Sequence, residues 1–404
     1  MNNSSLLLLK PPILRGIITL SQQERSLFQQ SIPLKAISLV PTKIRDLLSA
    51  LSPATVLDLP RIRHIVPAAT DQEKRLILLA KAPDQLLPQD LEAISRCQGT
   101  LVDYALKIDY AYWSVSQVLE AILPEGIPIP SSFETVGHIA HINLLQEHIP
   151  FKALIGQVIL DKNPTLKTVV NKIGNIENEF RVFPMEVIAG EADLLVAQVK
   201  EQQCTFRFDF SKVYWNSRLH AEHERLVERH FQKGQRICDV FAGVGPFTIP
   251  AAKRKSCTVY ANDLNPQSFY WLQENVKTNK VQPLVRTFNE DAVDFIPNSL
   301  KYLRTEEESV HFDHYILNLP AIATSFLKYF PAGEVEGIVH CYLFVKDVEG
   351  EEVQDPVAVV KAAVSGRSIE VVDVHSVRSV APLKTMYCVS FCFGRESASK
   401  RQSR

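Results

Sequence analysis

Three polar side chains, Asp239, Asp263 and Asn318, each follow a short apolar run in the second half of the chain. Runs of this length and composition indicate buried parallel strands, and ligands bind at the carboxyl ends of such strands. Two carboxylates at one sheet edge accept hydrogen bonds from hydroxyl or ammonium groups, but they repel a diphosphate. The arrangement therefore predicts a site for a cofactor that carries a cationic amine.

A glycine-containing turn follows the first of these strands, within Asp239-Val-Phe-Ala-Gly-Val-Gly-Pro-Phe247. Gly243 and Gly245 permit positive φ and let a ligand lie close to the backbone. Asp263 stands about twenty residues after the turn, where this fold places the acid that binds a ribose. Because Thr248 replaces the third glycine of a pyrophosphate-binding turn, the pattern favours S-adenosylmethionine. The alternative is a turn whose glycines only let a helix pack on a strand.

Further cofactor contacts are expected beside these strand ends. A third strand candidate, Val285–Phe288, runs into Asp291 and Ala292, where the acid can accept a hydrogen bond from an adenine amino group. Phe241 in the glycine turn is assigned either to the wall of the cofactor pocket or to the core. The segment Asn318-Leu-Pro320 exposes amide and carbonyl groups that suit a planar amino substrate.

The elements that hold these residues alternate between strands and helices from residue 210 to residue 395, which is typical of a Rossmann-like α/β domain. Late strands that complete its sheet are expected at 337–346, 368–377 and 385–393. The acidic residues 304–308 are expected to form a loop.

Two smaller modules precede this domain. Residues 1–100 combine short apolar runs with helical spacing and predict a small α/β module. Residues 101–209 contain mostly strand-like segments, among them 151–160, and predict an α+β middle domain. Residues 396–404 form a basic tail.

The chain resembles the tRNA guanine-37 N1-methyltransferases of the archaeal and eukaryotic type, which are class I S-adenosylmethionine-dependent methyltransferases. The resemblance lies in the glycine turn, in Asn318-Leu-Pro320 and most specifically in residues 212–225, and it covers nearly the whole chain. Further matching segments are Pro11-Pro12 with Arg15-Gly16, residues 62–66, 137–143 and 178–181, Glu186, Gly190-Glu191 and Asn262-Asp-Leu-Asn-Pro266.

The resemblance implies an activity and the residues that perform it. The activity is transfer of a methyl group from S-adenosylmethionine to N1 of guanine 37 in tRNA. Glu222, Arg181 and Asn318 are the expected catalytic residues: a carboxylate takes the N1 proton while a cation or donor stabilises charge on O6. Tyr214 and Arg218 are expected to contact the substrate. The implied cofactor-binding residues are His223, Asp239, Phe241, Gly243, Gly245, Asp263, Leu264, Asp291, Ala292, Asn318 and Pro320.

Other roles stay open for several of these residues. Glu222 also suits the first turn of a helix, and Glu224 and Glu228 stand in the same segment. His223 stands where many archaeal relatives have a second arginine, although its ring can still donate to the cofactor carboxylate. Trp215 suits either stacking on a base or packing in the core. The competing functions are the aminocarboxypropyl transferase of the wybutosine pathway and a tRNA-binding protein without catalysis.

Composition limits the classes of function. The chain has 404 residues, a net charge of -1 and seven cysteines without a C-x-x-C pair, so no metal site is expected. No apolar run reaches the roughly 18 residues of a membrane span. Basic residues outnumber acidic ones in residues 1–100, so we expect this module to recognise the shape of tRNA. We expect a monomer in the cytoplasm, with nuclear and mitochondrial pools left open. His138 and His141 are expected on opposite faces of a strand, in structural roles.

Overall fold

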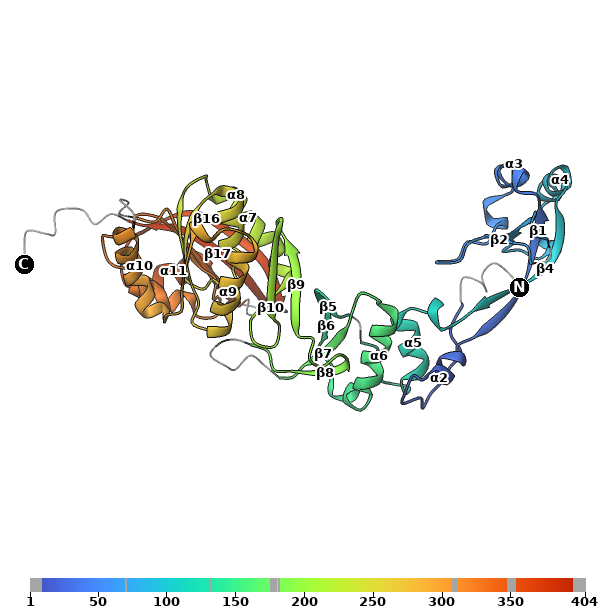
Figure 1. Cartoon of the computed structure of the whole chain (residues 1–404), viewed down its shortest axis with the longest axis horizontal. Helices are drawn as coiled ribbons and strands as arrows, with labels where there is room; N and C mark the ends of the chain where they lie inside the picture. Colours follow the sequence, from blue (N-terminus) through green and yellow to red (C-terminus); the bar gives the residue numbers. More distant parts are fainter. Residues whose placement is uncertain are drawn as a thin grey trace, which may run out of the picture. The chain divides into compact units, whose positions relative to one another are not determined.

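The computed structural model describes residues 9–69, 71–130, 132–174, 180, 182–306, 311–346 and 354–394 (Figure 1). The chain divides into two compact units. The first unit comprises Met1–Phe133, Asn143–Thr165 and Ile188–Gly190, and the second unit comprises Glu134–Ile142, Leu166–Val187 and Glu191–Arg404. The division into three modules with a basic tail stays a prediction.

The first unit contains an antiparallel sheet in the order β2–β3–β1–β4. Ile37 and Ile77 of this sheet form a core with Leu47 and Ile94 of two helices. The strands are β1 (Gln30–Leu39), β2 (Ile65–Pro67), β3 (Arg75–Leu78) and β4 (Thr100–Ile108), and the helices are α2 (Gln22–Ser26), α3 (Ile44–Ala50), α4 (Pro88–Arg96), α5 (Val115–Ile122) and α6 (Lys152–Lys162).

Helix α6 replaces the strand that was expected at 151–160, so that prediction is wrong. Leu154, Ile155 and Val158 recur at helical spacing and are all buried. A short apolar run fits a buried strand and a buried helix equally well, and packing decides between them. Gly156 allows the close packing, because a Cβ at this position would lie 2.8 Å from the Cβ of Ala189.

The second unit is built on a seven-stranded sheet in the order β13–β12–β11–β14–β15–β17–β16. Strands β11 to β15 are parallel to one another, whereas β17 pairs antiparallel with β15 and β16. This arrangement confirms the predicted Rossmann-like α/β domain. The strands are β11 (Arg236–Asp239), β12 (Thr258–Asn262), β13 (Val285–Phe288), β14 (His314–Leu317), β15 (Ile338–Lys346), β16 (Ile369–Ala381) and β17 (Lys384–Phe393), and the helices are α7 (His220–His230), α8 (Thr248–Lys255), α9 (Pro266–Thr278), α10 (Ala292–Glu306) and α11 (Pro356–Ala363).

Helix α10 also continues further than expected. It reaches Glu306, so the loop predicted at 304–308 is wrong for residues 304–306, and residues 307–308 lie outside the described residues. The helix persists because Leu300 and Leu303 continue its buried face. Their burial outweighs the run of acidic residues that favoured a loop.

A smaller sheet in the order β5–β6–β7–β8 and a hairpin of β9 and β10 precede the large sheet. His138 lies in the turn between β5 and β6 and not on a strand, with Nε2 3.1 Å from the carbonyl oxygen of Leu194. His141 lies on β6, where burial lowers its pKa to about 4. Both histidines therefore have structural roles. The strands are β5 (Glu134–Val136), β6 (Ile139–Ile142), β7 (Thr168–Lys172), β8 (Met185–Gly190), β9 (Val196–Glu201) and β10 (Cys204–Asp209).

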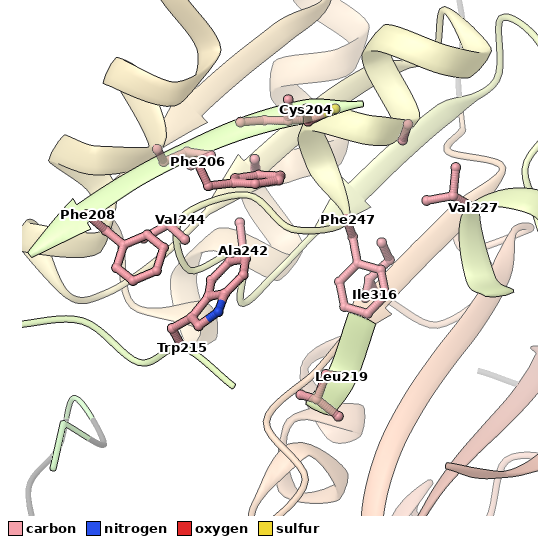
Figure 2. Close-up of a cluster of buried hydrophobic side chains, with 14 of the residues drawn as sticks. Cys204, Phe206, Phe208, Trp215, Leu219, Val227, Ala242, Val244, Phe247 and Ile316 are labelled. Carbon is pink, nitrogen blue, oxygen red and sulfur yellow. The ribbon is translucent and has the colours of Figure 1, made fainter. Parts of the chain in front are cut away.

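An aromatic core of the second unit includes residues of the glycine turn (Figure 2). The ring of Trp215 stacks on Phe208 with a centroid distance of 4.8 Å, and it tilts against Phe206 at 5.6 Å. Ala242 and Val244 of the turn belong to the same buried cluster. Trp215 is therefore a core residue, and its packing supports the turn from below the site.

Candidate cofactor-binding and catalytic site

Three strand ends meet at one edge of the large sheet. In the parallel register, Asp239 at the end of β11 pairs with Ala261 of β12 and with Ile316 of β14. Asp263 and Asn318 follow β12 and β14, so they lie at the same edge as Asp239. The register thus brings the three polar residues together, as the apolar runs predict.

Asp239 is fully buried and only half satisfied. Its Oδ2 accepts a hydrogen bond of 2.7 Å from the hydroxyl of Thr248, whereas Oδ1 has no hydrogen-bond partner among the described residues. Burial raises the pKa of this carboxyl to about 7, against the opposing effect of the Thr248 hydroxyl. A buried acceptor without a donor is costly, so Oδ1 is suited to receive a donor from a ligand.

Asp263 fixes the glycine turn through its carboxylate and retains lone pairs that can accept hydrogen bonds from a ligand. One oxygen accepts from the backbone N–H of Gly243 at 2.8 Å, and the other accepts from that of Asn265 at 3.0 Å. Burial raises the pKa of this carboxyl to about 6. Each carboxylate oxygen has a second lone pair, so Asp263 can accept ribose hydroxyls without losing these bonds.

The two glycines of the turn have different reasons for being glycine. Gly245 has φ +97°, and a Cβ there would lie 2.9 Å from Cδ1 of Leu272 and 3.0 Å from Ile249. Gly243 has φ +55°, but a Cβ there would have no atom within 4 Å. Gly245 therefore permits helix packing, whereas Gly243 faces open space, and its contact with a ligand stays a prediction.

A pair of alanine substitutions separates these roles. Gly245→Ala should lower the free energy of unfolding by about 1–3 kcal/mol, because the added methyl overpacks against Leu272. Gly243→Ala should destabilise less and should instead weaken S-adenosylmethionine binding, because its methyl enters the open space. Thermal unfolding and titration calorimetry on both variants check this expectation. Unchanged cofactor affinity in Gly243→Ala would show that the open space beside Gly243 is not part of the cofactor site.

Asn318 presents a second unpartnered acceptor at the sheet edge. Within the part of the chain that the structure describes, its buried Oδ1 has no hydrogen-bond partner. The segment that follows is fixed to the neighbouring strand, since the carbonyl oxygen of Pro320 accepts from the backbone N–H of Phe344 at 3.2 Å. Phe241 packs edge-on against Phe326 with a centroid distance of 5.1 Å and is partly buried, so it contributes both to the core and to the wall beside the turn.

The residues after β13 and β12 differ in exposure. Asp291 is exposed and caps α10, because its side chain accepts from the backbone N–H of Val293 at 2.9 Å. Ala292 is buried at the start of that helix, and Leu264 is 39% exposed. The exposed side of the Asp291 carboxylate remains accessible to a ligand, so the cap and the expected adenine contact are compatible.

Glu222 lies in the first turn of α7, as the helix interpretation expected, yet it is almost completely buried. Arg225 binds it with two hydrogen bonds, Nε to Oε2 at 2.6 Å and Nη2 to Oε1 at 2.8 Å. The hydroxyl of Tyr342 donates to Oε1 at 2.7 Å, and Nε2 of His375 lies 3.5 Å from Oε2. Leu317 pairs with Cys341, so the next residues, Asn318 and Tyr342, stand at one level. Glu222 is thereby hydrogen-bonded to a residue that lies across from Asn318 on the neighbouring strand.

His223 is held by a carboxylate that the sequence did not single out. Its Nδ1 lies 2.6 Å from Oε1 of Glu201, and both side chains are buried. The same Oε1 lies 3.3 Å from Nδ1 of the half-exposed His220. The ring of His223 meets Phe247 edge-on at 4.8 Å. A carboxylate at Nδ1 fixes the orientation of an imidazole and leaves Nε2 for another partner.

The two expected substrate residues belong to a polar and aromatic cluster in the second unit. Tyr214 is 40% exposed and stacks on Phe183 at 6.5 Å. Arg218 forms an ion pair with Glu134, and Nζ of Lys172 lies 4.1 Å from the ring of Phe183. Exposed aromatic and cationic groups of this kind suit an unstacked base. Arg181, the remaining expected catalytic residue, lies outside the described residues.

Arg225, Tyr342, His375 and Glu201 are the residues that the sequence did not reveal. Only Arg225 carried a local signal, since it follows Glu222 by three positions on a helix, where side chains become neighbours. Tyr342 and His375 reach the site from distant strands of the large sheet, and Glu201 reaches it from the hairpin of β9 and β10. Each is a single polar residue in a strand, and such residues carry no recognisable pattern.

Among the described residues, no helix has the length and apolar character to cross a membrane, and no cluster of three or more histidine, cysteine or acidic side chains is placed to hold a metal ion. All seven cysteines are free thiols. Burial raises the pKa of thiols such as Cys257, to about 11. Such thiols are protonated and unreactive at neutral pH.

Comparison with known proteins adds to this geometry. The family models of the TRM5/TYW2 methyltransferase domain and of the TYW2 N-terminal domain match residues 197–372 and 115–193. The tRNA (guanine(37)-N(1))-methyltransferase of Batrachochytrium dendrobatidis is 40% identical, with 94% of this chain and 90% of that protein covered. The human protein of the same name is 40% identical, with 98% and 79% covered. The solved structure of Trm5b from Pyrococcus abyssi, 24% identical, shares the fold with a TM-score of 0.62 over 89% of this chain and 99% of that one.

Proposed function

The chain belongs to the family of tRNA (guanine(37)-N1)-methyltransferases, and we propose that Glu222 and Asn318 carry out the reaction at the carboxyl edge of its large sheet. The enzyme transfers a methyl group from S-adenosylmethionine to N1 of guanine 37 in tRNA. The observations that carry the residue assignment are the unpartnered, buried oxygens on Asp239 and Asn318 among the described residues, and the buried Glu222 carboxylate, which Tyr342 binds from the strand next to β14.

The residues at this edge fit S-adenosylmethionine, which supplies the methyl group when bound. Oδ1 of Asp239 is an acceptor without a donor, which suits an ammonium group. Asp263 has lone pairs for ribose hydroxyls, and Asp291 has an exposed acceptor for an amino group. His223 has Nε2 available for a carboxylate. We assign these four residues to the cofactor, together with the wall formed by Phe241, Gly243, Leu264, Ala292 and Pro320.

Methyl transfer to N1 requires proton removal, because N1 of neutral guanine carries a proton and is a poor nucleophile. Glu222 accepts this proton in the proposed mechanism, and Asn318 orients the base through its amide. Arg181 is proposed to stabilise the negative charge on O6. Tyr214 and Arg218 are proposed to contact the unstacked guanine.

Arg225 is paired with a second carboxylate, which keeps its charge balanced when Glu222 takes up a proton. Its Nη1 lies 3.3 Å from Oδ2 of Asp373, in addition to the two bonds with Glu222. When Glu222 becomes neutral, the buried guanidinium still has a carboxylate partner. An unpaired buried arginine would be costly, so the shared pairing lets Glu222 change charge during each turnover.

One assay tests the proposed function against its competitors. Unmodified tRNA transcripts with guanine or adenine at position 37 are incubated with S-adenosylmethionine, and the product nucleosides are identified. N1-methylguanine from the guanine transcript alone is the expected result. Transfer of a three-carbon group would indicate the aminocarboxypropyl transferase, and binding without any transfer would indicate a tRNA-binding protein.

The sheet of the first unit is proposed to read tRNA shape. The helix and loops beside this sheet carry exposed basic residues such as Lys43, Arg45 and Arg63, and they share a core with the sheet. Contacts elsewhere on the folded tRNA would hold the anticodon loop in place while the target base leaves its stack. A monomeric state and a cytoplasmic location, with nuclear and mitochondrial pools, also stay predictions.

Removal of this sheet should weaken the binding of whole tRNA far more than the binding of an isolated anticodon stem-loop. Gln30 and Ile108 are paired across adjacent strands, so a short glycine-serine turn can replace residues 31–107. The affinity for whole tRNA should fall by roughly tenfold or more, and its salt dependence should become shallower because phosphate contacts are lost. Filter binding at several salt concentrations measures both. Unchanged affinity and slope on whole tRNA would assign the sheet a purely structural role.

A further inference from the structure

The carboxylate of Glu222 has little direct access to water. Its side chain is 3% exposed. Three side chains of the described structure lie within hydrogen-bond or ion-pair distance of it: Arg225, Tyr342 and His375. A base that takes a proton in each turnover must lose that proton before the next one. The route must therefore pass through one of these partners or wait for the site to open.

Two of the three partners cannot carry the proton away. The guanidinium of Arg225 stays protonated in proteins, and the hydrogen bonds and charge of Glu222 raise its pKa although burial opposes this. Tyr342 is fully buried, and burial raises its pKa well above 10. Its hydroxyl therefore remains a donor to Glu222 and neither accepts nor releases the proton.

His375 differs from both in position and in chemistry. It lies on β16, the edge strand of the large sheet, and its side chain is 36% exposed. Its Nε2 is 3.5 Å from Oε2 of Glu222, so the ring bridges the buried carboxylate and the solvent. Burial and the charge of Arg225 lower its pKa from the ordinary value, against the effects of Glu222 and Asp373. The lowered pKa favours the neutral ring, whose second nitrogen can take up a proton.

We propose that His375 relays the proton from Glu222 to water after each methyl transfer, an inference that rests on the proposed role of Glu222 as the base. The O–H bond of the Glu222 carboxyl breaks as an N–H bond forms at Nε2 of His375. The imidazolium then releases the proton at Nδ1 to water. Exchange with water returns the remaining proton from Nε2 to Nδ1 before the next turnover, so the enzyme regains its starting state.

The relay predicts a difference between the first turnover and the later ones. In His375→Gln, Glu222 still takes the first N1 proton, so the rate of the first turnover should stay within about twofold of the parent. Steady-state turnover in weak buffer should fall on the order of tenfold, because the base is reset slowly. Added imidazole should restore it, since a small base can replace the missing ring. Rapid-quench measurement of labelled methyl transfer separates the two phases.

Controls distinguish the relay from a structural role and from the assignment of the base. His311→Gln is matched in exposure, 36%, and should change neither phase. His375→Asn should repeat the result of His375→Gln, with a melting temperature near that of the parent. Steady-state turnover equal to the parent, a slowed first turnover, or a loss that imidazole does not restore would overturn the relay. A fast first turnover in Glu222→Gln would instead overturn the base assignment.

Discussion

Replacement of Glu222 by glutamine is expected to slow single-turnover methylation of tRNA by about 10²-fold or more. Glutamine keeps the size of the side chain and an acceptor for the Tyr342 hydroxyl, but it cannot take the N1 proton at neutral pH. Ground-state affinities for tRNA and for S-adenosylmethionine should change little, because neither is assigned to this carboxylate. Rapid-quench kinetics with saturating enzyme measures the chemical step apart from binding.

Glu224→Gln is the matched control for this substitution. Glu224 lies two residues along the same helix, is 50% exposed and forms a long ion pair of 3.8 Å with Arg254. Its substitution should leave the rate near that of the parent. If Glu222→Gln methylates within a few-fold of the parent across pH, the proton acceptor is Glu224 or a water molecule.

The strand ends of the cofactor site could be predicted from the sequence because they depend on local composition. The apolar runs that precede Asp263 and Asn318 coincide with β12 and β14, and the run at Val285–Phe288 coincides with β13. Parallel strands buried on both faces have nearly continuous apolar runs, and a polar residue then marks the end. The prediction fails at 151–160, where the run is equally compatible with the buried face of α6.

The surroundings of Glu222 could not be predicted, because they depend on strand order and register. Tyr342 and His375 reach the carboxylate from β15 and β16, and β17 lies between these strands in the sheet. Nothing in the sequence near either residue indicates that order. The sequence motif identified Glu222 as the candidate base. The groups that bind its carboxylate and are proposed to remove its proton, Tyr342 and His375, become its neighbours only in the folded sheet.

Asp239→Asn is expected to weaken cofactor binding and, at the same time, to stabilise the cofactor-free protein. Asparagine keeps an oxygen for the Thr248 hydroxyl but loses the charge that suits an ammonium group. Loss of a hydrogen bond to a charged group costs about 1.5–3 kcal/mol, or roughly 10- to 100-fold in affinity. A carboxyl whose pKa is moved from 3.8 to about 7 by burial carries roughly 4 kcal/mol of unfavourable ionisation, which asparagine removes.

The pH dependence identifies Asp239 as the source of the stabilisation. Its pKa is higher in the folded than in the unfolded state, so the folded protein binds more protons between about pH 4 and pH 7. Stability from this group is therefore lost as the pH rises through about 7. The advantage of Asp239→Asn over the parent should be largest near pH 8 and should vanish near pH 4. Buried histidines such as His314, with a pKa lowered to about 4, act in the opposite direction but equally in both proteins.

Melting temperatures from about pH 5 to 8 and calorimetry at pH 8 measure the two effects, with Asp355→Asn as a control. Asp355 caps α11 through the backbone N–H of Val357, a role that asparagine also fulfils, so this variant should change neither quantity. Stabilisation with unchanged cofactor affinity would make Asp239 a buried charge without a ligand. Weakened binding with no stabilisation would mean that burial does not raise the pKa of this carboxyl in the free protein. Weaker cofactor binding together with higher stability would indicate that the charge of Asp239 destabilises the folded protein and serves to bind the cofactor.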